Sequence, residues 1–259
     1  VFNHTGSNSR YFNAEGFYPE PGAAQSTESP YFSWYSFHPW PTDYDAWWGV
    51  HTLPAVNEEQ PDYRRFIISD KDSVVRHWLR LGADGWRLDV AADLGLSADF
   101  NHKFWQDFRK NVKEANPEAI ILAEHYGNTR DWLQGNEWDT VMNYDAFMEP
   151  VTWFLTGMEK HSDDYREDLL GNAESFWGAM RHHTSSFSMP SWQVAMNELS
   201  NHDHSRFLTR TNHKVGRTNT LGPQAAEQGI NKAVFREGVV IQMTWTGAPT
   251  IYYLSLIHI

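Results

Sequence analysis

Short apolar runs alternate along this chain with longer segments in which apolar residues recur every three or four positions. Residues 83–91 follow the two-residue period of a β-strand, which places Trp86 and Leu88 on one face. The opposite face carries Arg87 and Asp89. Because these two side chains would lie side by side on the strand, we predict an ion pair between them.

Segments with helical spacing flank this strand. One helix is predicted over residues 70–81, with Ser69 or Asp70 as its N-cap. A second begins at Asp99 and ends before the Asn-Pro pair at 116–117. The predicted buried stripes are Val74, Val75, Trp78 and Leu79 in the first helix and Phe100, Phe104, Phe108 and Val112 in the second.

Strands and helices continue to alternate, which is typical of a parallel sheet. Polar residues follow the carboxyl ends of several predicted strands, and in an α/β barrel those ends line the active-site face. The predicted class is therefore α/β, with an α/β barrel as its architecture. Further strands are predicted over residues 119–123, 140–144, 193–198 and 249–253, and helices over 146–185 and 223–245.

The segment from Gly6 to Asn57 follows neither period and is rich in Pro, Gly, Ser and aromatic residues. A long loop of this kind is either functional or disordered. Its aromatic rings favour an ordered loop or a small subdomain, because they can build a local core. The rings are those of Tyr31, Phe32, Trp34, Tyr35, Trp40, Tyr44, Trp47 and Trp48.

Composition narrows the class of ligand. The 259 residues, of which 41% are hydrophobic and 21% charged, suit one large globular domain with or without a small insertion. A formal net charge of -12, with no basic patch, argues against nucleic acid as a partner and favours neutral substrates. Thirteen Trp, fifteen Phe and eleven Tyr provide flat surfaces for sugar rings, although most of them are expected to belong to the core.

The sequence has no cysteine, no signal peptide and no apolar run long enough to cross a membrane. Disulfides and thiolate metal sites are therefore excluded. Secretion and a cytoplasmic location both stay open, because the chain does not begin where a gene begins.

Asp89 and Glu124 are the candidate catalytic carboxylates. Arg87 would keep Asp89 ionised, as a nucleophile requires, although a structural ion pair explains the two residues equally well. Glu124 follows an apolar run, where a dry environment would favour the protonated acid, and an exposed strand-end carboxylate is the simpler alternative. Two carboxyls in contrasting environments suit the nucleophile and the acid of retaining glycoside hydrolysis.

A third acid, Asp203, lies between His202 and His204 and also suggests a metal site. A His-x-His pair alone is poor evidence for zinc, which usually takes three or four ligands. The adjacent His182 and His183 are predicted to be solvated helix residues.

Four segments, in chain order, resemble the conserved regions of the α-amylase family, glycoside hydrolase family thirteen. They are Val-Phe-Asn-His at 1–4, Gly-Trp-Arg-Leu-Asp at 85–89, Ile-Leu-Ala-Glu at 121–124 and Leu-Ser-Asn-His-Asp at 199–203. Two further segments agree with this. Residues 53–57 resemble the motif near the end of the family's inserted domain B, and residues 247–253 resemble its eighth barrel strand.

The resemblance implies a retaining double-displacement mechanism in which Asp89 is the nucleophile and Glu124 the general acid/base. Asp203 would be the third carboxylate, which holds hydroxyls of the distorted sugar. The resemblance further implies that the substrate-binding residues are His4, Arg87 and His202. The chemistry requires no cofactor, and Asn3 matches a position that binds a structural calcium ion in many relatives.

The resemblance also implies an incomplete (β/α)8 TIM barrel, without its first strands and last helix and with a short domain B insertion after the third strand. The chain ends in Leu-Ser-Leu-Ile-His-Ile, which resembles translated adaptor sequence rather than protein. Such a barrel cannot close, so we expect the isolated chain to be unstable. The expected parts are 1–5 as the end of the third strand, 6–60 as the domain B-like insertion, 61–253 as the barrel part and 254–259 as a non-native tail.

The form of these regions most resembles the neopullulanase, cyclomaltodextrinase and amylopullulanase branch. It implies hydrolysis of α-1,4 and in some cases α-1,6 bonds in maltodextrins, starch or pullulan. Residues 91–93, Ala-Ala-Asp, leave the product-side specificity open. An α-glucan transglycosylase or branching enzyme and a non-catalytic carbohydrate-binding barrel are the alternatives. The expected partner is an α-glucan, without nucleic acid or membrane, and a homodimer of the full-length protein is compatible with this branch.

Overall fold

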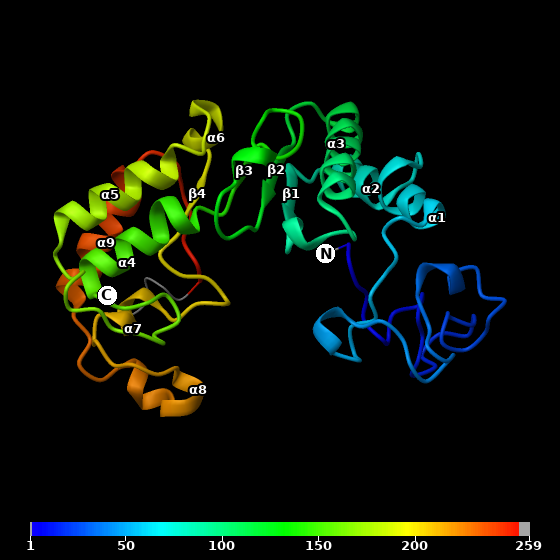
Figure 1. Ribbon diagram of the computed structural model, residues 1–259, viewed down its shortest axis with the longest axis horizontal. Coiled ribbons are helices and arrows are strands. Elements are labelled where there is room, and N and C mark those ends of the chain that lie inside the picture. The colour runs from blue at the N-terminus through cyan, green and yellow to red at the C-terminus, as the bar shows by residue number, and fades with distance from the viewer. Residues whose placement is uncertain (1, 254–259) are drawn as a thin grey trace. The chain divides into compact units, whose positions relative to one another are not determined.

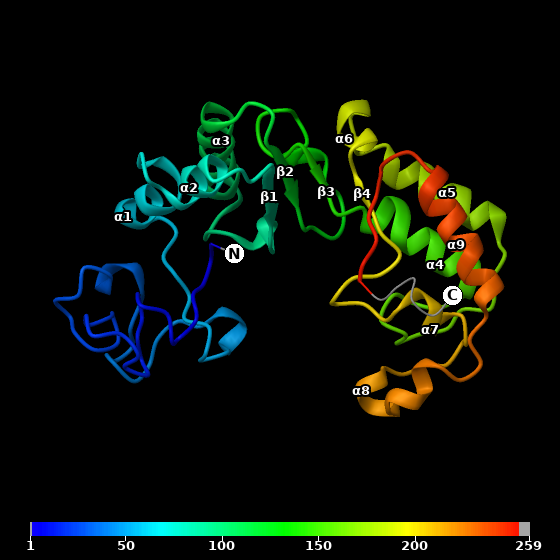
Figure 2. The ribbon, with the colours of Figure 1, turned by 180° about the vertical axis from the view of Figure 1, so that it is seen from behind.

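The computed structural model describes residues 2–253, which form two compact units (Figures 1 and 2). The first unit is Val1–Glu124 with Asn136–Trp138, and the second is His125–Gly135 with Asp139–Ile259. The tail predicted at 254–259 lies outside the described residues. Within 2–253, every helix is too short or too polar to cross a bilayer.

The first unit is built on two parallel strands, β1 (Gly85–Leu88) and β2 (Ile120–Ala123). Gly85 lies opposite Ile120, and Leu88 lies opposite Ala123. A Cβ atom on Gly85 would stand 2.2 Å from the carbonyl oxygen of Ile120, so only glycine permits this approach. The predicted strands and their parallel pairing are confirmed.

Helix α3 (Ala98–Ala115) is the crossover that connects the two strands, as parallel pairing requires. It begins where the Ser97 hydroxyl accepts a hydrogen bond from the Phe100 backbone N–H, at 3.2 Å, and it ends before Pro117. Phe104, Phe108 and Val112 are fully buried, which confirms most of the predicted stripe.

Helix α2 (Val74–Arg80) begins later than predicted, because Ser73 is its N-cap in place of Ser69 or Asp70. Trp78 is 52% exposed and does not belong to the buried stripe, contrary to the prediction. The residues before α2 form two short helices that the spacing did not predict. They are α1 (Pro61–Arg64) and η3 (Arg65–Ser69).

Residues 6–60 are ordered without a long helix or a sheet, as the sequence predicts. Their regular elements are two single turns, η1 (Phe32–Trp34) and η2 (Trp47–Gly49). The segment contains a small aromatic core, in which Phe12 contacts Tyr35 and Tyr44 at ring centroid distances of 4.9 and 4.7 Å.

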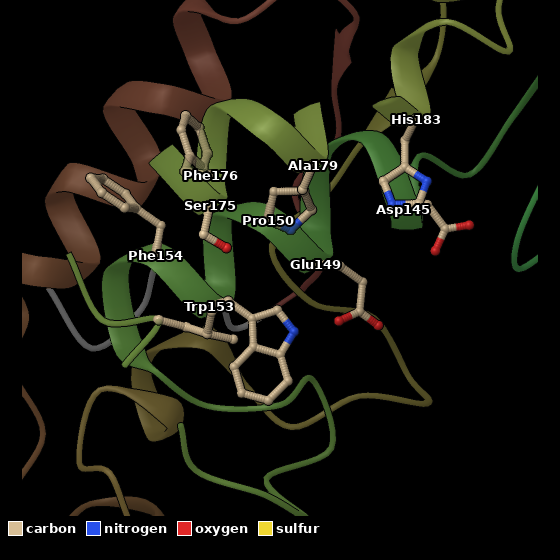
Figure 3. A pocket seen from close by; sticks show the side chains of 10 residues that line it. Asp145, Glu149, Pro150, Trp153, Phe154, Ser175, Phe176, Ala179 and His183 are labelled. Atoms are coloured by element: carbon tan, nitrogen blue, oxygen red, sulfur yellow. The ribbon is translucent and has the colours of Figure 1, made fainter. Parts of the chain in front are cut away.

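The second unit is mainly helical around β4 (Met196–Asn197), which pairs in parallel with β5 (Ala248–Pro249). Helices α4 (Glu149–Thr156) and α5 (Ala173–Thr184) pack through Phe154 and Phe176, whose ring centroids are 4.9 Å apart (Figure 3). The unit's other elements are η5 (Arg130–Trp132), β3 (Thr140–Val141), η6 (Tyr144–Met148), α6 (Met189–Gln193), α7 (Phe207–Arg210), α8 (Thr218–Leu221), η7 (Pro223–Ala226) and α9 (Lys232–Thr244).

Four predictions for this unit need correction. The strands predicted over 140–144 and 249–253 are reduced to β3, which ends at Val141, and β5, which ends at Pro249. The helix predicted over 223–245 is broken, because Gly229 has a φ of +76° and α9 starts only after Asn231 caps it. The strand predicted over 193–198 is shorter, since Gln193 ends helix α6. The described part of the chain contains no closed barrel.

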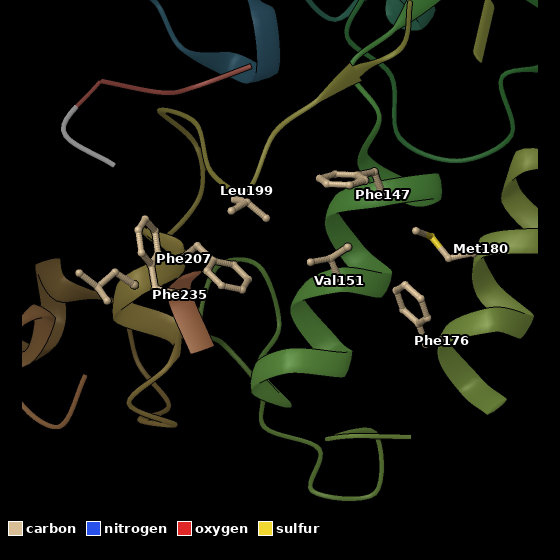
Figure 4. Packing of buried hydrophobic residues seen from close by; sticks show 8 residues of the cluster. Phe147, Val151, Phe176, Met180, Leu199, Phe207 and Phe235 are labelled. Carbon is tan, nitrogen blue, oxygen red and sulfur yellow. The ribbon is translucent and has the colours of Figure 1, made fainter. Parts of the chain in front are cut away.

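The core of the second unit joins α4, α7 and α9. Phe147, Val151 and Phe207 are buried there together with Phe235 (Figure 4). Arg210 is fully buried beside them and donates hydrogen bonds to Thr152 Oγ1, at 2.6 Å, and to the carbonyl oxygen of Leu199. Burial lowers the pKa of Arg210 to about 10.

Phe108 offers a test of the first core. Its ring centroid lies 5.4 Å from that of Trp105 and 5.7 Å from that of Phe2. Phe108→Ala is expected to lower the free energy of unfolding by about 3–5 kcal/mol, because the cavity cannot collapse fully. Urea unfolding followed by circular dichroism measures the change, and exposed Trp78→Ala is the control, with an expected effect of about 0.5 kcal/mol or less. A loss below about 1 kcal/mol for Phe108→Ala would contradict this packing.

Glu58, a buried residue of the first unit, generates a pH-dependent prediction. Burial raises the pKa of Glu58 to about 7, from 4.5 in the unfolded chain, while backbone hydrogen bonds from Glu58 and Gly95 oppose the rise. The folded state therefore binds an additional proton between these pH values, and its stability falls as the pH rises through them.

Glu58→Gln should remove this dependence on pH. Relative to the variant, the parent protein should lose up to about 3 kcal/mol of unfolding free energy between pH 4.5 and about 7. Urea unfolding at several pH values measures the difference, with the exposed Glu118→Gln as the matched control. Parallel pH profiles for the parent and Glu58→Gln would contradict the prediction.

Candidate active site

Two carboxylates emerge together from the carboxyl ends of β1 and β2. Asp89 follows Leu88 directly, and Glu124 follows Ala123, the residue paired with Leu88. The Glu124 backbone N–H donates a hydrogen bond to the Leu88 carbonyl oxygen at 2.8 Å and extends the ladder by one step. The register of the two strands therefore brings the acids predicted as nucleophile and general acid/base to the same edge.

Arg87 contacts both acids. Its Nη1 forms an ion pair with Asp89 Oδ1, which confirms the predicted pair, and its Nη2 lies 3.3 Å from Glu124 Oε2. The second contact was not predicted. The Glu124 side chain is only 8% exposed, whereas those of Arg87 and Asp89 are 32% and 31% exposed. Asp89 can therefore meet a substrate, while Glu124 lies deeper in the first unit.

Val90 shapes the turn that follows Asp89. Its φ is +42° and its ψ is +45°, a left-handed conformation that β-branched residues rarely adopt. In this conformation the Val90 backbone N–H donates a hydrogen bond to Glu124 Oε2 at 3.1 Å. Such strain costs about 1–3 kcal/mol and persists where the surroundings demand it. The residue pattern does not predict this role, because the apolar side chain of Val90 fits the strand period. The short helix η4 (Ala91–Asp93) follows Val90.

His4 also belongs to the first unit. Its ring stacks on Trp47 with centroids 4.9 Å apart, and its Nδ1 lies 2.8 Å from Asn3 Oδ1. Burial lowers the pKa of His4, and the Asp89 carboxylate acts in the opposite direction. His4 is therefore within electrostatic reach of Asp89. With Nδ1–H donated to Asn3, the Nε2 atom of the neutral ring can accept a hydrogen bond from a hydroxyl.

The calcium prediction for Asn3 gains no support from its surroundings. Its Oδ1 is engaged by His4, and its Nδ2 is a buried donor without a partner. A calcium ion requires six to eight oxygen ligands, and a donor nitrogen cannot supply one. Among residues 2–253, no group of three His, Cys, Asp or Glu side chains is placed to hold a metal.

Asp203 and His202 lie in the loop that follows β4 in the second unit. His202 Nε2 is 3.3 Å from Asp203 Oδ2, and the two side chains are 59% and 44% exposed. The loop is held from within, because the Asp203 backbone N–H donates to Asn201 Oδ1 at 2.9 Å. Nδ1 of His161 donates to the Asp203 carbonyl oxygen at 2.9 Å. The exposed carboxylate thus stands on a fixed backbone.

His204 is buried behind this loop, and its Nε2 lies 3.2 Å from the Tyr126 hydroxyl. Burial lowers the pKa of His204 to about 3, so the ring is neutral at ordinary pH. His202 is exposed, and the two rings do not join Asp203 in any metal-binding cluster of the described residues. The metal alternative for this motif is therefore not supported. His182 is exposed as predicted, whereas His183 is half-buried.

Comparisons with known proteins agree with this arrangement. The family described as the alpha amylase catalytic domain matches residues 1–258. The amylopullulanase of Thermoanaerobacterium saccharolyticum is 31% identical and covers 98% of this chain, which spans 20% of that protein. The neopullulanase 2 of Thermoactinomyces vulgaris is also 31% identical and covers 98% of this chain, which spans 37% of that protein. The chain thus spans well under half of the curated relatives it matches.

Solved structures extend the likeness to the fold. The debranching enzyme from Nostoc punctiforme superposes with a TM-score of 0.77 at 28% identity, covering 98% of this chain and 48% of that chain. The likeness supports a TIM-barrel-like fold, in agreement with the parallel strands and their helical crossover. Taken with the family match over residues 1–258, it establishes that the chain belongs to the alpha-amylase family of catalytic domains.

Proposed function

We propose that this chain carries the catalytic residues of a retaining glycoside hydrolase that cleaves α-glucosidic bonds in maltodextrins, starch or pullulan. The observation that carries the proposal is the guanidinium of Arg87 between the carboxylates of Asp89 and Glu124 at adjacent strand ends. Relatives named amylopullulanase, neopullulanase and cyclomaltodextrinase support an α-glucan substrate.

In the proposed mechanism, Glu124 protonates the glycosidic oxygen while Asp89 attacks the anomeric carbon. The C–O bond to the leaving group breaks, and a glycosyl ester forms on Asp89. A water molecule then attacks the same carbon, gives its proton to Glu124 and releases Asp89 as a carboxylate. Arg87 orients Asp89 for both steps through the ion pair between the two side chains.

Two contacts fix Glu124 Oε2 in position. Arg87 Nη2 lies 3.3 Å from this oxygen, and the Val90 backbone N–H donates a hydrogen bond to it at 3.1 Å. The carboxyl group is therefore held in one place for the proton transfers of both steps.

We assign substrate-positioning roles to the remaining predicted residues. Asp203 would accept hydrogen bonds from hydroxyls of the distorted sugar, and His4 and His202 would bind hydroxyls of the same ring. Their chemistry fits, since Asp203 and His202 expose polar atoms on a fixed loop and His4 presents a neutral ring. No cofactor takes part in these steps, and calcium at Asn3 stays a prediction.

The finer architecture is also a proposal. We propose that residues 1–5 end the third strand of a (β/α)8 barrel, that 6–60 form a domain B-like insertion and that 61–253 belong to the barrel. The aromatic core of residues 6–60, which lacks a sheet of its own, supports a separate insertion. A homodimer of the full-length protein stays a prediction.

Glu124→Gln in the full-length protein tests the general acid/base assignment. Its turnover of maltooligosaccharides should fall by about 10²–10⁴-fold, because an amide cannot exchange the proton. Turnover of an α-glucosyl fluoride should fall less in the first step, since fluoride leaves without a proton from the enzyme. Reducing-sugar release and fluoride release measure the two rates.

Glu114→Gln is the matched control for this variant. Glu114 is an exposed carboxylate on α3, paired with Arg76 at 2.8 Å, and its loss should leave the rates unchanged. Full activity of Glu124→Gln on maltooligosaccharides would refute the assignment. Inactivity of the parent protein on every α-glucan would favour the non-catalytic alternative.

Product analysis separates hydrolysis from transglycosylation by the same residues. Hydrolysis of maltohexaose should release one new reducing end for each bond broken, because water accepts the glycosyl group from Asp89. Chromatography of the products, together with a reducing-end assay, measures this ratio. Longer or branched products without new reducing ends would instead establish a transglycosylase or branching enzyme.

A further inference from the structure

The second unit contains a cavity of about 270 Å³ between helices α4 and α5. Residues at helical spacing on each helix face it: Glu149, Pro150, Trp153 and Phe154 on α4, and Ser175, Phe176, Ala179 and His183 on α5. Asp145, in η6 just before α4, completes its polar side. None of these residues belongs to the catalytic set proposed above.

The lining combines a flat ring with hydrogen-bond acceptors. The Trp153 indole and the Glu149 carboxylate project from the same side of α4, one turn apart (Figure 3). Phe154, Phe176 and Pro150 add apolar surface, and the carboxylate of Asp145 adds a second acid. Apolar walls combined with a few convergent polar groups are typical of a small-ligand site.

The carboxylates are held in place within the unit. Glu149 Oε1 forms an ion pair with Lys160 Nζ, and Asp145 Oδ2 accepts a hydrogen bond from the Gly127 backbone N–H. Each carboxylate can accept up to about four hydrogen bonds, so these contacts leave capacity for ligand donors. The groups are therefore orientated before a ligand arrives, which lowers the entropic cost of binding.

Size and charge select the ligand class. A volume of about 270 Å³ suits one or two sugar rings and is below that of most sites for larger ligands. Two carboxylates repel an anion, and the described residues offer no three-ligand cluster for a metal ion. A neutral ring with an apolar face and several hydroxyl donors satisfies both the indole and the acids.

We infer that this cavity is an accessory binding site for a glucosyl unit of an α-glucan chain, with Trp153 as the stacking surface and Glu149 and Asp145 as hydroxyl acceptors. The inference deepens the proposed function and rests on its substrate class. Such a site would hold a second portion of the polymer apart from the bond that is cleaved.

Equilibrium dialysis with labelled maltoheptaose tests the assignment in the full-length protein. The Asp89→Asn background prevents turnover, so the number of maltoheptaose molecules bound per chain is measurable. Trp153→Ala in this background should lose one binding equivalent, because the stacking surface is removed. Trp78→Ala, which removes an exposed tryptophan from α2 outside the cavity, is the matched control and should retain all equivalents.

A second variant tests the site without changing a residue of α4, so that damage to this helix cannot explain a loss of binding. Ser175 is exposed on α5 and faces the cavity, so Ser175→Tyr fills the space without deleting a core contact. It should lose the same binding equivalent, with an unchanged circular dichroism spectrum. Full stoichiometry in both Trp153→Ala and Ser175→Tyr would overturn the accessory site and leave hydrolysis by the parent protein as separate support for the proposed function. Failure of the parent to hydrolyse α-glucans would refute that function, whereas loss of one equivalent in both variants would still establish the site.

Discussion

The candidate site depends on one guanidinium held between two carboxylates. Without Arg87, the acids that follow β1 and β2 would repel each other at adjacent strand ends. The guanidinium of Arg87 allows both carboxylates to lie at this edge, with Asp89 partly exposed and Glu124 buried. Partial burial strengthens the contacts, since neighbouring charges interact more strongly where water is excluded. The site is therefore a property of strand register as much as of residue type.

Register in turn depends on backbone features around the two strands. Gly85 permits the close approach of β1 to Ile120, and the buried face of α3 covers the pair from Phe104 to Val112. At the other end, the left-handed Val90 turns the chain so that its N–H meets Glu124. The strain at Val90 is tolerated because packing and the Arg87 contacts determine the positions on both sides. If the register of β1 and β2 shifted by one residue, Asp89 and Glu124 would no longer lie side by side at the strand ends.

The sequence predicted the elements with a strong period and the acids at strand ends. Helix α3 and strands β1 and β2 were predictable because their apolar spacing and the Asn-Pro pair that ends the helix agree. The pairing of Arg87 with Asp89 followed from their spacing on one face. The contact from Arg87 to Glu124 was not predictable, since it joins residues 37 positions apart through tertiary pairing.

The errors have equally local causes. Gly229, with its positive φ, interrupts the helix predicted over residues 223–245. Ser73 is the N-cap of α2 in place of Ser69 or Asp70, because its hydroxyl accepts a hydrogen bond from the Arg76 N–H. The residue pattern does not predict the positive φ of Val90, because valine is a typical strand residue. His183 was expected in solvent, yet it is half-buried and lines the cavity between α4 and α5.

The two candidate sugar-binding surfaces share one electrostatic principle. In the first unit, Arg87 offsets the charge of Asp89 and Glu124, and in the second unit Lys160 offsets that of Glu149. An acid paired with an internal cation keeps its acceptor lone pairs but contributes less negative potential. In a chain with a net charge of -12, such pairing allows carboxylates to serve as acceptors for a neutral polyol without gathering counter-ions at the site. The acidic composition and the neutral substrate class are thus consistent with each other.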